Sequence, residues 1–376
     1  MQPDLRTGIE NMLLRCGGLR PGQAVLIVTE AEDGGYYGAG LAEAVAEVAG
    51  ALGLAATLRR EPFTARAAPA AETLAEIGRA DRTVFLSRLG DQLRFDSVLA
   101  ASAPVMCYAL DAGMMASGFG RGEHDAFLAL LGCLNAALSG AREIRVTCPL
   151  GTDFAGPGAM FPETAAEVSV RRFPLSVFTP VPAGAYAGRI AQAGFLTGTG
   201  KTFYEPYTLP LDGVLALDFE GNRITGFDGS AADAARAEAH YRRIGGMMGT
   251  DPFFVHSWHA GMHPGCGWPV QAGADVARWG GGAFGNPRIL HFHTCGAYPP
   301  GEISVNVIDP TIRLDGVPVW QDGRLHPDRV PGGAEILARY PEAARLFAEP
   351  ERAVGLGPSG RLCARPEPQP VAASSA

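Results

Sequence analysis

Apolar runs and amphipathic segments alternate along the first part of the chain. Residues 5–15 have the spacing of an amphipathic helix, and residues 24–29 form a continuous apolar run typical of a strand buried in a parallel sheet. The alternation continues with predicted helices at 40–52 and 67–77 and predicted strands at 55–58 and 82–87. Because such strands are joined by right-handed crossovers, the pattern predicts a doubly wound, Rossmann-like α/β domain over residues 1–140.

After residue 140 the pattern changes to short strands separated by turn signals such as Asp228-Gly229. The predicted strands are 144–147, 168–170, 214–219, 223–227, 288–293 and 303–308, with one long helix at 231–244. We therefore predict a β-rich α+β domain over residues 141–363. Residues 364–376 lack apolar periodicity and are rich in Pro, Ala and Ser, which predicts a disordered tail.

Composition narrows the classes of function. Apolar residues make up 47% of the chain and charged residues 19%, an ordinary globular balance, and the net charge of -8 argues against a nucleic-acid or anionic-membrane partner. No export signal is recognisable at the start of the chain, and no apolar run approaches the length of a membrane span. The 7 cysteines include no C-x-x-C pair, which favours reduced thiols. We expect a cytoplasmic protein that acts on a small molecule.

Histidines supply the clearest chemical signal. Five of the 8 histidines fall in a short stretch and are His256, His259, His263, His291 and His293. Imidazole is the commonest side-chain metal ligand, and the two rings of His291-Phe-His293 lie on one face if this segment is a strand. In an extended segment His259 and His263 share one face and His256 takes the other. This density favours a metal or catalytic site over the alternative that each ring is an ordinary hydrogen-bonded residue.

A carboxylate is expected to complete the site. Two histidines and one carboxylate on one face are the usual arrangement for ferrous iron with open positions for substrate and dioxygen. Glu302 follows His293 along the chain and is the first candidate. Asp309, in Asp309-Pro310, is the second, although its position before proline favours a turn residue over a ligand.

Motifs along nearly the whole chain support a family resemblance. They are residues 13–28 (LLRCGGLRPGQAVLIV), 144–153 (IRVTCPLGTD), 218–229 (DFEGNRITGFDG), 261–265 (GMHPG) and 314–316 (LDG). Together they resemble the aminopeptidase T group of metallopeptidases and its relative 2,5-dihydroxypyridine 5,6-dioxygenase. The resemblance implies a metal-dependent enzyme that assembles as a homo-oligomer, a dimer or higher.

The expected ligand set departs from the family pattern. Where the peptidases place a carboxylate ligand in a Gly-Glu-Val-Phe type stretch, residues 200–203 read Gly-Lys-Thr-Phe, and the family's His-x-Asp ligand pair falls on Glu302-Ile-Ser304. The dioxygenase's earlier ligand histidine falls near His256 to His259, with Ser257 at the aligned position, and His291 matches the peptidase ligand histidine. These changes favour a mononuclear site on the dioxygenase side of the family. The expected ligands are His259, His291 and Glu302, with His256, His263 and His293 as neighbours of the ligands or as substitute ligands.

The resemblance implies Fe(II) and opening of a hydroxylated N-heteroaromatic or related ring. In that reaction His293 or His263 is the expected general base. Tyr298, with Trp258 and Phe292, is expected either to wall the ring by stacking or to be plain packing, which is as frequent for aromatic residues next to ligands. One alternative is a hydrolase on the same fold, aminopeptidase or cyclic-amide hydrolase, in which Zn(II) or another divalent metal activates water. A second alternative is a non-catalytic binding protein.

Overall fold

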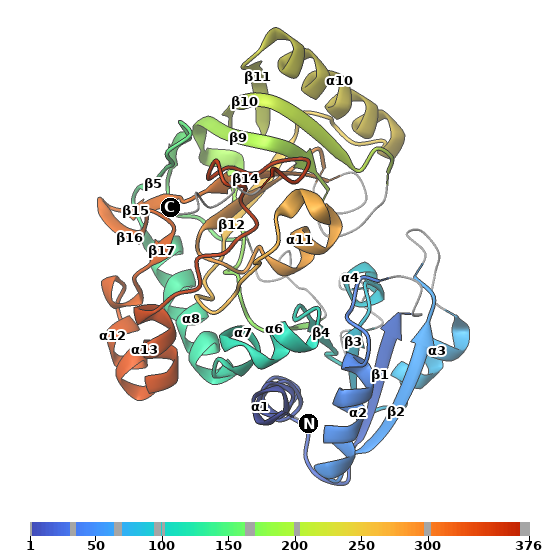
Figure 1. The fold of residues 1–376 in the computed structure, drawn as a ribbon. Helices are drawn as coiled ribbons and strands as arrows, with labels where there is room; N and C mark the ends of the chain where they lie inside the picture. The colour runs from blue at the N-terminus through green and yellow to red at the C-terminus, as the bar shows by residue number, and fades with distance from the viewer. Residues whose placement is uncertain are drawn as a thin grey trace, which may run out of the picture.

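The computed structural model describes residues 2–30, 35–63, 70–93, 99, 102–161, 170–198, 204–296 and 302–368. These residues form a mixed α/β structure with a five-stranded sheet A and a twelve-stranded sheet B. The two sheets lie in different halves of the molecule (Figure 1). The predicted fold class, a parallel α/β part followed by a β-rich part, is confirmed. None of the helices in the described ranges combines the length and the apolar character of a membrane span.

Sheet A is parallel throughout and has the strand order β2-β1-β3-β4-β7. Its strands are β1 (Ala24–Glu30), β2 (Ala55–Glu61), β3 (Arg82–Leu86), β4 (Val105–Cys107) and β7 (Arg171–Phe173). The accompanying helical segments are α1 (Pro3–Glu10), a π-helical turn (Asn11–Cys16), α2 (Leu41–Ala51), α3 (Ala71–Ile77) and α4 (Leu89–Leu93). The apolar run of β1 is buried on both faces, because Val25 and Ile27 pack into one core and Leu26 and Val28 into another. Strand β7 joins this sheet from beyond residue 140.

Sheet B is antiparallel and has the order β17-β16-β15-β5-β6-β9-β14-β13-β12-β8, with the β10–β11 hairpin paired to β9. Its strands are β5 (Ile144–Thr147), β6 (Asp153–Gly156), β8 (Val181–Pro182), β9 (Ala187–Thr197), β10 (Thr208–Glu220), β11 (Arg223–Asp228), β12 (Val255–Ala260), β13 (Ile289–Thr294), β14 (Ile303–Ile308), β15 (Thr311–Leu314), β16 (Val317–Gln321) and β17 (Arg324–Leu325). The longer helices beside it are α8 (His124–Gly140) and α10 (Ala231–Met248). The shorter helices are α6 (Ala112–Ala116), α7 (Gly118–Arg121), α11 (Val276–Gly282), α12 (Gly333–Arg339) and α13 (Pro341–Ala348).

The three strands β12, β13 and β14 have two chemically different faces. Trp258, Phe292 and Val305 are directly opposite one another and point into the largest core of the protein. Phe154 meets the rings of Trp258 and Phe292 edge-on there, with centroids 5.6 and 5.0 Å apart. Of the two roles that the sequence leaves open for Trp258 and Phe292, a wall for the substrate or plain packing, the structure favours packing, because both are core residues. The other face of these strands carries the polar residues Ser257, His259, His291, His293, Ser304 and Asn306, with Ile289 and Ile308 at its end.

The C-terminal segment is held against the β-rich part over residues 364–368, where the sequence predicts a disordered tail. The Gln271 side-chain amide donates to the Glu367 carbonyl at 2.9 Å, and the Glu367 N–H donates to Gln271 Oε1 at 2.7 Å. This reciprocal pair orders the segment although its sequence has no apolar period. Residues 369–376 lie outside the described residues.

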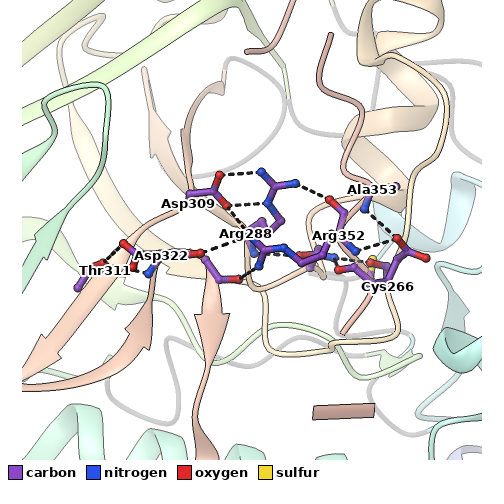
Figure 2. A network of polar contacts seen from close by, with 10 residues as sticks. Cys266, Arg288, Asp309, Thr311, Asp322, Arg352 and Ala353 are labelled. Atoms are coloured by element: carbon purple, nitrogen blue, oxygen red, sulfur yellow. Dashed lines mark hydrogen bonds and ion pairs between the residues drawn. The ribbon is translucent and has the colours of Figure 1, made fainter. Parts of the chain in front are cut away.

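A network of charged side chains fixes the ends of β13 and β14 (Figure 2). Arg288, just before β13, forms a bidentate ion pair with Asp309, just after β14, with N–O distances of 2.6 and 2.7 Å. Arg352 approaches the same carboxylate at 3.5 Å. Asp309 has a φ of 51°, a left-handed conformation that aspartate tolerates better than most residues. Asp309 therefore occupies a turn and neutralises Arg288, in agreement with the role that its position before proline favours.

We expect Asp309→Ala to lower the free energy of unfolding by roughly 2 kcal/mol, because it leaves the half-buried Arg288 guanidinium without its partner. Chemical denaturation measures this change. Asp328→Ala removes an exposed carboxylate and is the matched control, with an expected change within about 0.5 kcal/mol. Full stability of Asp309→Ala, accompanied by loss of bound metal, would instead identify Asp309 as a ligand.

Candidate metal centre

Three imidazole rings converge on the polar face of β12 and β13. His259 lies directly across from His291, and His293 is two residues further along β13 on the same face. The Nε2 atoms of His259 and His291 are 2.6 Å apart, and one ring nitrogen from each of the three histidines lies within 4.8 Å of the others. His259 and His291 are only 5% and 3% exposed. Among the described residues this is a compact group of nitrogen donors removed from bulk water.

Hydrogen bonding to the backbone orients His259. Its Nδ1 lies 3.2 Å from the carbonyl oxygen of Phe178, which can only accept a hydrogen bond. Nδ1 therefore carries the proton in the neutral ring, and Nε2 presents its lone pair toward His291. A carbonyl that fixes the tautomer in this way is the usual partner of a metal-binding histidine. The ring of Phe284 packs against His291 at a centroid distance of 4.3 Å and holds it in place.

A hydroxyl group bridges His293 and His256. Ser257 Oγ lies 3.0 Å from Nδ1 of His293 and 2.8 Å from Nδ1 of His256. One hydroxyl can accept from one ring and donate to the other, so His293 can hold its proton on Nδ1 and direct Nε2 toward the other histidines. Burial and the neighbouring His293 lower the pKa of His256 to about 4, which keeps that ring neutral and able to accept. The ring of Phe161 stacks on His256 at 4.8 Å.

A bulge in β12 explains the position of His256. Val255 pairs with Thr294 but Ser257 pairs with His293, so two residues of β12 stand opposite one residue of β13. Regular alternation predicts His256 on the face opposite to His259. The extra residue instead turns His256 toward Ser257 and His293, on the side of the histidine group.

Glu302 lies at the beginning of β14 beside His293. Its Oε1 is 3.8 Å from Nε2 of His293, and the residue is 3% exposed. The Tyr204 hydroxyl donates to the Glu302 backbone carbonyl at 3.0 Å, which anchors the residue at this end of the strand. The structure thus brings Glu302 next to the histidine group, at a distance beyond a direct hydrogen bond to His293.

The structure places His263 elsewhere. Strand β12 ends at Ala260, so the alternation that would put His263 beside His259 stops before it. The His263 ring stacks on Phe127 at a centroid distance of 3.8 Å and accepts a hydrogen bond from the Gly265 N–H. Complete burial lowers its pKa to about 3, so this ring is a neutral member of the packing near α8. Tyr298 lies outside the described residues.

The donor set fits a divalent metal ion. Ligand nitrogens around a tetrahedral zinc with bonds of about 2.0–2.1 Å are roughly 3.3 Å apart, comparable with the spacing within this group. Two of the rings have a partner on the far nitrogen, the Phe178 carbonyl for His259 and the Ser257 hydroxyl for His293. A carboxylate stands beside them. Iron and zinc both accept imidazole and carboxylate ligands, so the residues suit either metal.

Several contributors to this site carry no clear signal in the sequence. The Phe178 carbonyl is a backbone group, and Phe161 and Phe284 come from distant segments without a motif. Ser257 could be flagged only because it stands where the family resemblance places a ligand histidine. Its bridging role depends on the bulge in β12, which no residue pattern predicts.

Comparison with known proteins supports the fold. No protein-family model matches the chain, and a search of characterised proteins by sequence finds no match. The structure resembles that of 2,5-dihydroxypyridine dioxygenase from Pseudomonas putida, with a TM-score of 0.56, 15% sequence identity, and coverage of 85% of this chain and 96% of that one. Wild-type AmpT from Thermus thermophilus matches with a TM-score of 0.45 and 12% identity over 85% of this chain and 98% of its own. The chain thus has the fold of the dioxygenase.

Proposed function

We propose that this protein is a mononuclear metal enzyme and that its reaction is the oxidative opening of a hydroxylated aromatic or N-heteroaromatic ring by dioxygen. The convergence of His259, His291 and His293 carries the proposal. The dioxygenase whose fold the chain shares supports the choice of reaction, as does the carboxylate of Glu302 beside the rings. Both atoms of dioxygen enter the ring-opened product, so the reaction needs no further reductant.

His259, His291 and His293 would hold the metal, and Fe(II) suits the reaction because it can bring substrate and dioxygen together at open positions. The Phe178 carbonyl and the Ser257 hydroxyl keep the rings in the required tautomers. The surrounding burial keeps bulk water away from the reacting groups, which strengthens the electrostatic interactions there.

Glu302 is the proposed proton acceptor for the substrate hydroxyl. Its carboxylate is buried and lies next to the ring of His293, so it can take up a proton without contact with bulk water. His293, the base expected from the sequence, belongs to the histidine group in the structure. This proposal therefore gives His293 the role of a ligand and Glu302 the role of the base.

A zinc-dependent hydrolase is the second candidate, and the donor set gives it specific support. Three neutral histidines with an open fourth position are the ligand set of some catalytic zinc sites, where the metal lowers the pKa of bound water. Glu302 would then act on that water. Both candidates share the site and differ in the metal and the substrate.

Replacing His291 with alanine should lower metal affinity by more than about 100-fold, since removal of an outer partner of a metal ligand already costs 10- to 100-fold. Elemental analysis after purification without chelator, followed by metal titration, measures this loss. His259→Ala and His293→Ala are expected to behave alike. His263→Asn is the control, because His263 lies outside the group, and it should retain wild-type metal content. Stoichiometric, tight metal in His291→Ala would disprove the proposed centre.

Glu302→Gln should leave the metal bound and lower kcat by about 10²- to 10⁴-fold, because the amide has the shape of the carboxylate but cannot accept a proton. Metal content and turnover are measured on the same preparation. Loss of metal in this variant would make Glu302 a ligand, as the family resemblance implies. Unchanged turnover would remove it from the mechanism.

Metal identity and oxygen uptake separate the two candidate reactions. Iron near one equivalent per chain and oxygen consumption with dihydroxypyridines are expected for the dioxygenase. Zinc in the purified protein, with release of product from amide or cyclic-amide substrates and no oxygen uptake, would establish the hydrolase instead.

A further inference from the structure

A second set of buried polar side chains lies beside the histidines on the same face of sheet B. Asn306 is directly across from His291, and Ser304 is directly across from His293. Thr197, at the end of β9, pairs with Ser304 from the other side. Directly opposed residues of antiparallel strands point to the same face, so this set continues the histidine group across β14 to β9.

Two atoms in this set have no hydrogen-bond partner among the described residues. Asn306 is 1% exposed and Thr197 is fully buried, yet Nδ2 of Asn306 and the hydroxyl of Thr197 are both unpaired. The Asn306 amide is nevertheless oriented, because Ser304 Oγ donates to its Oδ1 at 3.1 Å. The Asn306 backbone N–H donates to the buried Gln192 at 2.6 Å. The surrounding hydrogen bonds thus hold a donor in place without satisfying it.

Buried polar groups of the same type are paired at Thr152 and Asn286, whereas the buried Thr83 hydroxyl is unpaired like that of Thr197. The Thr152 hydroxyl accepts from the Ala191 N–H at 2.9 Å. The Asn286 amide donates to the carbonyls of Cys266 and Glu351 and accepts from the Arg288 N–H. A buried donor without a partner destabilises a folded protein, so such a group usually has a strained or functional role. Here two of them lie next to the candidate metal centre.

We infer that Asn306 and Thr197 form a hydrogen-bonding subsite for an acceptor oxygen of the substrate bound at the histidine group. This inference rests on the proposed function and specifies its substrate class as molecules with an oxygen substituent, hydroxyl, oxo or carboxylate, away from the group held at the histidines. Neighbouring strands are about 4.8 Å apart, so that oxygen lies roughly one ring width from the histidine side chains. The Asn306 amide donates to it, and the Thr197 hydroxyl donates or accepts.

The first test compares the thermal stability of variants with that of the wild type in the absence of substrate. Thr197→Val removes an unpaired hydroxyl at nearly constant volume, so its unfolding midpoint should equal or exceed that of the wild type. Asn306→Leu also deprives the Ser304 hydroxyl of its acceptor, so it should lower the midpoint, but by less than Asn286→Leu. Thr152→Val and Asn286→Leu make the same chemical changes at paired residues and should lower the midpoint. Clear destabilisation by Thr197→Val and Asn306→Leu, matching these controls, would show that both groups serve the fold and would overturn the inference.

The second test uses binding of 2,5-dihydroxypyridine and of pyridine to the metal-loaded protein without oxygen, measured by calorimetry. The wild type should prefer 2,5-dihydroxypyridine, and Asn306→Leu and Thr197→Val should each weaken that binding by about 10-fold or more while leaving pyridine binding and metal content unchanged. Equal binding of both compounds by the wild type, or unchanged affinity in the variants, would overturn the subsite.

The two proposals fail in different ways. Binding that depends on Asn306 and Thr197, without oxygen uptake when oxygen is admitted, would reject the dioxygenase reaction and retain the subsite. Ring opening by Asn306→Leu with a wild-type KM would retain the reaction and reject the subsite.

Discussion

The candidate centre depends on the pairing register of β12, β13 and β14. Side chains alternate between the two faces of a strand, so a shift by one residue would move His259, His291 and His293 into the aromatic core and bring Trp258 and Phe292 into the site. The aromatic core therefore selects the register, since burial of two large rings stabilises only one of the two arrangements. The ion pair between Arg288 and Asp309 closes the far ends of β13 and β14 in that same register. Packing of the aromatic residues on one face of the sheet thus positions the three histidines on the other face.

The sequence predicts much of this arrangement because the relevant strands are regular. The apolar run at 24–29 and the β/α alternation that follows it indicate sheet A, and the spacing of His291 and His293 places both rings on one face. Glu302 could be named from its proximity in sequence. Each of these inferences needs only the spacing of residues within one strand or helix and the residues that follow it along the chain.

The remaining features depend on contacts between distant segments. The position of His256 follows from a bulge, and the separation of His263 follows from the end of β12 at Ala260. Strand β7 joins sheet A although it lies in the region where the sequence predicts a separate domain. Hydrogen bonds from Gln271 hold residues 364–368, which have no apolar pattern. Local periodicity carries no information about such partners.

The bulge in β12 also affects how this chain is compared with proteins of similar fold. At the bulge, β12 has one more residue than the paired part of β13. A residue of β12 that precedes Ser257 therefore has one equivalent when residues are matched along the sequence and another when they are matched by their partners on β13. The sequence resemblance places Ser257 where a ligand histidine is expected, whereas in the structure the Ser257 hydroxyl lies between the rings of His256 and His293. Residues of β12 should therefore be matched to those of another protein by their partners on the neighbouring strand. A single inserted residue changes which side chains of the strand face the metal centre.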